Sequence, residues 1–68
     1  MVDSNALRGL LAKNNISQSK MADIIGITPK TFYTKMKKRV FDSDEIGIMM
    51  EELGIDDPTP IFFVQGDL

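Results

Sequence analysis

The sequence predicts an all-α fold, a compact bundle of four to five short helices. Four segments open in the same way: a capping residue is preceded by an apolar residue, and a second apolar residue stands five positions after the first. Within each segment, apolar residues recur every three or four positions, and no segment shows the sustained alternation typical of a strand. The length of 68 residues is that of one domain, which we expect to span residues 1–68.

The helix starts are predicted from the caps and from the apolar pairs around them. The predicted caps are Asp3, Ser17, Thr28 and Asp42. The apolar pairs are Val2 with Leu7, Ile16 with Met21, Ile27 with Phe32, and Phe41 with Ile46. Each pair can form a hydrophobic staple, and Glu45, three residues after Asp42, predicts a capping box. Pro29 follows Thr28 at the first helical position, where the missing N–H costs nothing.

The helix ends are predicted from polar and glycine stops. Asn14 and Asn15 end the first helix, Gly26 ends the second, and Gly54 followed by Ile55 suits a Schellman cap after the fourth. The predicted core-facing side chains are Leu7, Leu10, Leu11, Met21, Ala22, Ile25, Phe32, Met36, Ile46, Met49, Met50 and Leu53.

A short tail, residues 57–68, follows the fourth helix. Asp57 is predicted to cap a fifth helix that begins at Pro58, with Pro60 at its third position. The apolar run 61–64 is interpreted as part of this helix, packing back on the core, with a strand as the alternative.

Charge is distributed very unevenly along the chain. The formal net charge is only −2, yet residues 20–40 carry six basic side chains and one acidic one. Residues 41–68 carry eight acidic side chains and no basic ones. Five basic residues fall between Thr28 and Arg39, which indicates either a solvated helix face or a surface that contacts a polyanion.

The motif at the centre of the chain is "QSKMADIIGITPKTFYTKMK", residues 18–37. Two short helices are separated by a tight turn, with Ala22 where the helices must approach closely and Gly26 where the chain must turn. This arrangement, over about residues 17–38, is a helix-turn-helix, whose second helix can enter the major groove of DNA.

From about residue 4 to residue 53 the sequence resembles the phage repressor and Cro (lambda-repressor-like, XRE-type) helix-turn-helix family. The most specific stretch is "SQSKMADIIGITPKTF". Lys35 departs from the family, which often carries an apolar residue there, and Met36 takes over one position later. The departure indicates a subgroup of small phage regulators, which contains Cro-like DNA binders and also small modulators that bind a phage repressor protein.

The resemblance implies a lysis–lysogeny regulator in the cytoplasm of a bacterial host, with double-stranded DNA as its partner. A homodimer is a possible binding unit, because one recognition helix presents few base contacts and useful specificity usually needs two copies on a two-fold site. The implied base-facing residues are Thr28, Pro29, Lys30, Tyr33, Thr34 and Lys37. The implied phosphate contacts are Ser17, Gln18, Ser19, Lys35, Lys38 and Arg39. Lys30 is expected to bind guanine and the Thr34 methyl to meet thymine.

The alternative is an antirepressor that binds a phage repressor protein through acidic and apolar side chains. The residues of this possible partner surface are Glu51, Glu52, Ile61, Phe62 and Phe63. The segment "PIFFVQGDL" is also the predicted dimer surface, although its apolar residues can equally close the core of the monomer.

An enzyme is not expected. The chain has no histidine and no cysteine, so it lacks the usual nucleophile and base pairs. A calcium loop at "DSDEIG" fails because Ile46 and Leu53 occupy its fifth and twelfth positions. We therefore expect no catalytic residue, metal site, cofactor or small-molecule substrate. No apolar run approaches the roughly 20 residues that span a membrane, and a signal peptide is not expected.

Overall fold

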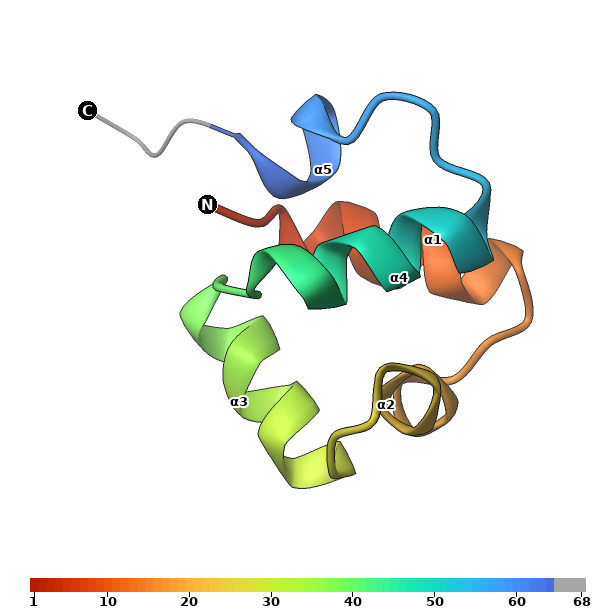
Figure 1. Cartoon of the computed structure of the whole chain (residues 1–68), viewed down its shortest axis with the longest axis vertical. Helices are drawn as coiled ribbons and strands as arrows, with labels where there is room; N and C mark the ends of the chain where they lie inside the picture. Colours follow the sequence, from red (N-terminus) through yellow and green to blue (C-terminus); the bar gives the residue numbers. More distant parts are fainter. Residues whose placement is uncertain (65–68) are drawn as a thin grey trace.

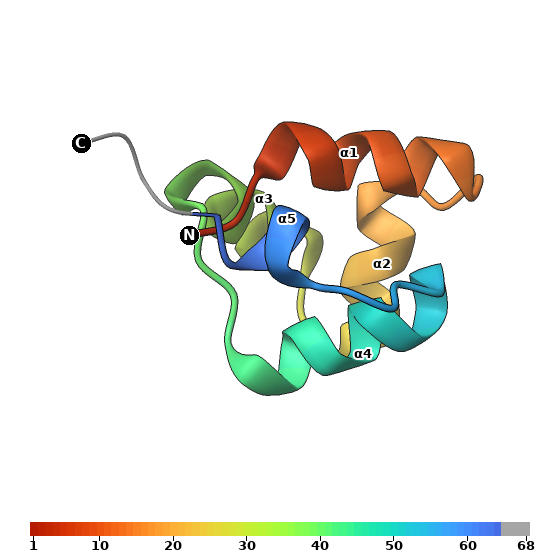
Figure 2. The ribbon, with the colours of Figure 1, turned by 90° about the horizontal axis from the view of Figure 1, so that it is seen from above.

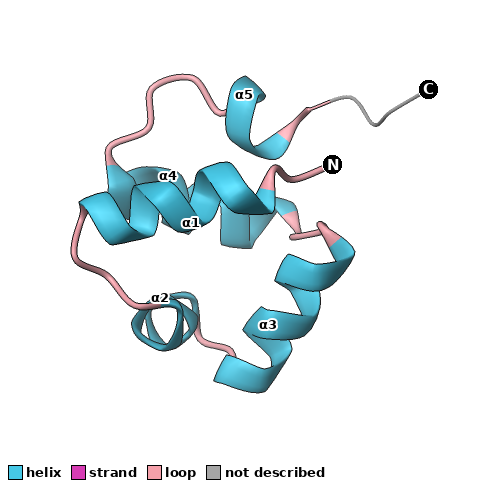
Figure 3. Ribbon diagram, turned by 180° about the vertical axis from the view of Figure 1, so that it is seen from behind, coloured by secondary structure: helices cyan, strands magenta, loops and turns pink. Residues whose placement is uncertain are grey.

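The computed structural model describes residues 1–64, and the regular structure in that range is entirely helical (Figure 3). The five helices are α1 (Ser4–Lys13), α2 (Gln18–Ile25), α3 (Pro29–Lys38), α4 (Ser43–Leu53) and α5 (Thr59–Phe62). The predicted all-α class is confirmed. No helix within residues 1–64 is long and apolar enough to cross a membrane.

All four predicted capping residues are confirmed. The side chains of Asp3, Ser17, Thr28 and Asp42 each accept a hydrogen bond from the backbone N–H three residues later, over 2.9–3.2 Å. The capping box at the start of α4 is complete, because Glu45 Oε1 accepts the backbone N–H of Asp42 at 2.9 Å. The first turn of each of the helices α1 to α4 is therefore stabilised by the side chain of its predicted capping residue.

The ends of α1 to α4 also follow one pattern. Each is followed by a residue with a positive φ angle, namely Asn15, Gly26, Arg39 or Gly54. The amide one residue further on donates to the carbonyl five positions back, over 2.9–3.1 Å, which is the Schellman bond. The stops at Gly26 and Gly54 were predicted. Arg39, an unusual residue for this conformation, was not.

The helices surround one core (Figure 1). Helix α2 packs against α3 and α4, and α5 packs against α1. Viewed from above, α1 and α4 lie on opposite sides of the core with α5 between them (Figure 2). The largest fully buried side chains are Phe32, Phe62, Leu7, Leu11, Met21, Met49 and Val2.

The fifth helix differs from its prediction at both ends. It begins at Thr59, one residue later than predicted, so Pro60 is its second residue. Asp57 nevertheless stabilises the start of this helix, because Asp57 Oδ1 accepts a hydrogen bond from the Thr59 N–H at 3.0 Å. Hydrogen bonds from Thr59, first from its backbone and then from its side chain, lower the pKa of Asp57. The helix ends at Phe62, and the last part of the predicted tail, residues 65–68, lies outside the described residues.

The N-terminal segment joins the end of α3 to α5. The Val2 N–H donates to Arg39 O at 2.9 Å, and Arg39 Nε donates to Val2 O at 2.8 Å. On its other side the segment pairs with the α5 region, where the Asp3 N–H donates to Ile61 O at 2.7 Å and the Val64 N–H donates to Met1 O at 3.0 Å. These bonds fix the C-terminal end of α3 relative to the rest of the domain.

Candidate nucleic-acid interface

Helices α2 and α3 form the predicted helix-turn-helix. Gly26, with φ of +83°, turns the chain out of α2, and the Thr28 cap starts α3 two residues later. Ala22 and Phe32 are both fully buried where the two helices meet. The turn and this contact set how α3 leaves α2.

Helix α3 faces the core through two side chains, Phe32 and Met36, which lie one turn apart and are both buried. The Phe32 ring also packs against Phe41, with ring centroids 5.3 Å apart. Apart from the half-buried Lys35, the other side chains of α3 are exposed. All six residues of the predicted base-facing set are exposed: Thr28, Pro29, Lys30, Tyr33, Thr34 and Lys37. The structure therefore brings them together on one accessible helix.

The predicted phosphate contacts separate into two groups. Ser17, Ser19 and Lys38 are exposed, and Gln18 is half-buried at the first position of α2. The Ser17 Oγ already accepts the Lys20 N–H at 3.0 Å as the helix cap. Lys35 and Arg39 are half-buried and engaged within the chain.

Lys35 is held by the first turn of α4. Its Nζ donates to both carboxylate oxygens of Glu45, at 2.7 and 2.8 Å, and lies 3.9 Å from Asp42 Oδ2. The Glu45 side chain is only 8% exposed, so this ion pair is largely removed from water. Lys35 therefore links α3 to α4.

Arg39 is held by the N-terminal segment, through the bond from its Nε to Val2 O. Its backbone ends α3 in the left-handed conformation, with φ of +61°. The phosphate contacts predicted for Lys35 and Arg39 would thus come from side chains that already make intramolecular bonds.

The possible partner residues lie in different environments. Glu51 and Glu52 are exposed on α4, and Ile61 is half-buried. Phe62 is only 2% exposed, so of the two roles left open for it, partner surface or core, its burial favours packing in the core of the monomer. Phe63 is 55% exposed and is the aromatic residue of this run that remains accessible.

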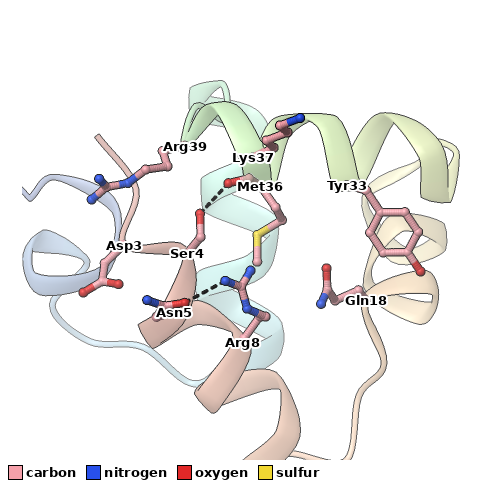
Figure 4. Close-up of a pocket in the computed structure, with 9 residues that line it drawn as sticks. All are labelled: Asp3, Ser4, Asn5, Arg8, Gln18, Tyr33, Met36, Lys37 and Arg39. Carbon is pink, nitrogen blue, oxygen red and sulfur yellow. Dashed lines mark hydrogen bonds between the residues drawn. The ribbon is translucent and has the colours of Figure 1, made fainter.

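A surface hollow beside α3 was not predicted from the sequence. A cleft of about 560 Å³ lies between the N-terminal half of α1, the start of α2 and the C-terminal half of α3 (Figure 4). It is lined by Asn5 and Arg8 from α1, by Gln18 from α2, and by Tyr33 and Lys37 from α3. Asn5 and Arg8 gave no signal in the sequence, because an isolated polar pair on α1 is indistinguishable from an ordinary solvated face.

The comparisons with known proteins support a helix-turn-helix regulator but not the phage repressor and Cro family that the sequence resembles. The sequence model of the family described as "Bacterial regulatory protein, Fis family" matches residues 1–38, which cover α1, α2 and α3. Comparison with curated proteins and with solved structures gave no match. The family match covers more than half of the 68 residues. With its exposed α3 and its α2–turn–α3 geometry, the chain belongs to the Fis family of bacterial regulatory proteins, and its helix-turn-helix is that of a DNA-binding transcription regulator.

Proposed function

We propose that the chain is a phage- or prophage-type regulator of the Cro or repressor kind, which occupies operator DNA with α3 in the major groove. The observation that supports this most directly is the solvent face of α3. Lys30, Lys37 and Lys38 are exposed, and the ion pairs within residues 1–64 involve only Lys35. Three cations are therefore available to a polyanion on the helix that the motif presents to DNA.

We assign base contacts to the exposed set on α3: Thr28, Pro29, Lys30, Tyr33, Thr34 and Lys37. Lys30 can donate to guanine O6 and N7. The Thr34 hydroxyl donates to Lys30 O at 3.0 Å, so its proton is already used, while its oxygen can still accept a hydrogen bond and its methyl can meet a thymine. Pro29 offers only apolar contact. Sequence discrimination is therefore expected to rest mainly on Lys30 and its neighbours on this face.

We assign phosphate contacts to Ser17, Gln18 and Ser19 at the start of α2, and to Lys38. Backbone N–H groups at a helix start favour an anion, and Lys38 adds a full charge. Lys35 and Arg39 complete the predicted set. We expect smaller contributions from them, because Glu45 already neutralises Lys35 and Val2 O already accepts a hydrogen bond from Arg39.

We further propose that two copies bind a two-fold operator in the cytoplasm of a bacterial host. One recognition helix reads only a few base pairs, and a dimer doubles the number that are read. The exposed Phe63, at the end of α5, is the described residue that best fits a contact between copies.

Titration of duplex DNA over a range of salt concentrations tests the proposal. The duplexes should include DNA from the genomic neighbourhood of the gene. We expect binding whose log affinity falls with log salt by about 0.9 for each phosphate contacted. Absence of binding to every duplex at low salt would contradict the proposed function.

The second candidate is a modulator that binds a phage repressor protein. It is favoured by α4, where Asp44, Glu51 and Glu52 are exposed and take part in no ion pair within residues 1–64. Such a surface can complement the basic DNA-reading face of another regulator. The double variant Glu51→Lys/Glu52→Lys separates the two functions. A modulator loses its partner, whereas a DNA binder keeps its affinity for DNA or gains some.

A further inference from the structure

The cleft beside α3 presents hydrogen-bond donors at one end. Figure 4 shows Gln18 and Tyr33 at the end opposite Asp3, and it shows Arg8, on the α1 side, between Asp3 and Gln18. Lys37 stands at the rim and points away from the floor. The guanidinium, ammonium, amide and phenol groups there can all donate hydrogen bonds. Their combination suits an anion with several oxygen atoms.

Arg8 is oriented in the cleft but not neutralised. Its Nη2 donates to Asn5 Oδ1 at 2.6 Å, so a neutral amide fixes the guanidinium. Asp3 is the carboxylate that lines the cleft, and its Oδ1 accepts the Ala6 N–H at 3.0 Å as the cap of α1. Since no ion pair joins Arg8 to Asp3, the charge of Arg8 remains available. The planar guanidinium fork matches the oxygen atoms of a phosphate group.

The polar groups at the floor of the cleft already have hydrogen-bond partners within the chain. The Ser4 hydroxyl donates to Met36 O at 2.6 Å, and the Met36 side chain is buried. Neither of these residues therefore offers an unpaired polar group to a ligand. The groups that remain free lie at the opening, beside the exposed face of α3.

We infer that Arg8 and Gln18, at this opening beside the base-facing Tyr33 and Lys37, bind a phosphodiester group of the DNA backbone. The inference rests on the proposed function and adds a contact from α1 that the helix-turn-helix motif alone does not supply. DNA is the source of the phosphate because Tyr33 and Lys37 belong both to the cleft and to the proposed base-reading face.

A hollow on the opposite flank of α3 suggests that the helix contacts the DNA phosphate backbone on both of its flanks. There, Lys30, Thr34 and Lys38 line a second hollow of about 390 Å³. A helix seated in the major groove has a phosphate backbone on each of its flanks. Arg8 on one flank and Lys38 on the other would thus seat α3 between the two strands.

The test compares Arg8→Gln with Lys13→Gln on one duplex over a range of salt concentrations. Both variants remove one positive charge from an exposed position of α1, but Lys13, in the last turn, does not line the cleft. For Arg8→Gln we expect affinity to fall about tenfold at low salt and the slope of log affinity against log salt to decrease by about 0.9. For Lys13→Gln we expect affinity within about twofold of the wild type and an unchanged slope.

A third variant, Asn5→Ala, tests the orientation of Arg8. It removes the acceptor that holds the guanidinium but no charge, so affinity should fall about threefold with the slope unchanged. Thermal unfolding of all three variants reports whether they remain folded.

Two results would overturn the inference and leave the proposed function intact. One is wild-type DNA binding with Arg8→Gln indistinguishable from Lys13→Gln. The other is an NMR titration in which inorganic phosphate shifts the Arg8 side-chain signals although Arg8→Gln binds DNA as the wild type does, which would make the cleft a site for free phosphate. Failure of the wild type to bind any duplex would overturn both proposals.

Discussion

The Ser4 hydroxyl donates a hydrogen bond of 2.6 Å to the carbonyl oxygen of Met36. This bond connects the first turn of α1 to the last turns of α3, across 32 positions of the sequence. Carbonyl groups at the end of a helix lack partners within the helix, and Ser4 supplies one from elsewhere. The position of the recognition helix thus depends on a side chain outside the helix-turn-helix.

Ser4→Ala is expected to lower the free energy of unfolding by about 1 kcal/mol, because a buried hydrogen bond is lost. The loss stays near this value because the Arg39 N–H also donates to Met36 O, at 3.3 Å. For a domain of this size the midpoint of thermal unfolding should fall by about 4–8 °C. Ser43→Ala, at an exposed position in the first turn of α4, is the matched control and should change the midpoint little. Equal midpoints for the two variants would contradict the role assigned to Ser4.

The helices could be predicted from the sequence because their signals are local. A capping residue and the two apolar residues of its staple lie within six consecutive positions, as residues 41–46 show. The capping residue read from this pattern, Asp42, is also the one whose side chain caps the helix in the structure. Gly26 and Gly54 were predictable for the same reason, since glycine is the residue that adopts a positive φ without strain.

The contacts that fix α3 could not be predicted, because they join residues far apart in the chain. Nothing near Arg39 in the sequence indicates that its Nε meets Val2 O, and nothing near Lys35 shows that Glu45 is its partner rather than solvent. The five basic residues between Thr28 and Arg39 look alike in the sequence. In the fold, two of them, Lys35 and Arg39, make intramolecular bonds. The other three take part in no ion pair within residues 1–64. Phe62 illustrates the same limit: the sequence left both a partner surface and the core open for it, and the fold buries it.

Two exposed helix glycines offer a route to a more stable domain. A Cβ atom built on Gly9 or Gly47 meets no heavy atom within 4 Å, so alanine should fit without strain. Each change, Gly9→Ala or Gly47→Ala, is expected to raise the free energy of unfolding by about 0.5–1 kcal/mol through lower backbone entropy in the unfolded chain. Chemical denaturation measures this gain.

The contrasting variant is Gly26→Ala, where the space is also open but φ is +83°. It should be destabilised by about 1 kcal/mol, because an L-residue is strained in that conformation. Stabilisation by all three changes would show that the turn after α2 does not need a left-handed residue.

The Lys35–Glu45 ion pair is expected to contribute to stability rather than to DNA binding. Lys35→Met leaves the Glu45 carboxylate, 8% exposed, without its cation, and should lower the free energy of unfolding by about 1–3 kcal/mol. Adding Glu45→Gln removes the unpaired charge and should recover part of this loss. Because Lys35 is already neutralised, Lys35→Met should also leave the salt dependence of DNA binding nearly unchanged. A decrease in slope by about 0.9 would instead identify Lys35 as a phosphate contact.

Arg39 is expected to position α3 through Val2, and a charge-conserving change tests this. Arg39→Lys keeps the positive charge but loses the Nε–H that donates to Val2 O. If the arginine acts through position, affinity should fall by about threefold to tenfold while the salt slope stays constant. If it contacts a phosphate as a simple charge, lysine should preserve both the affinity and the slope. Comparison of the two titrations decides between these roles.

The last prediction separates the two ends of α3 by their effect on sequence discrimination. Lys30 lies in the first turn, among the residues proposed to face bases, and Lys38 is the last residue of the helix. Lys30→Ala should reduce the preference for the operator over random DNA by about 1–3 kcal/mol, because a contact to one base pair is lost. Lys38→Ala should weaken binding to operator and random DNA by the same factor and reduce the salt slope by about 0.9. Paired titrations on the two duplexes measure both quantities. If Lys38→Ala lowers discrimination while Lys30→Ala does not, α3 lies in the groove with its C-terminal end toward the bases, opposite to the orientation proposed here.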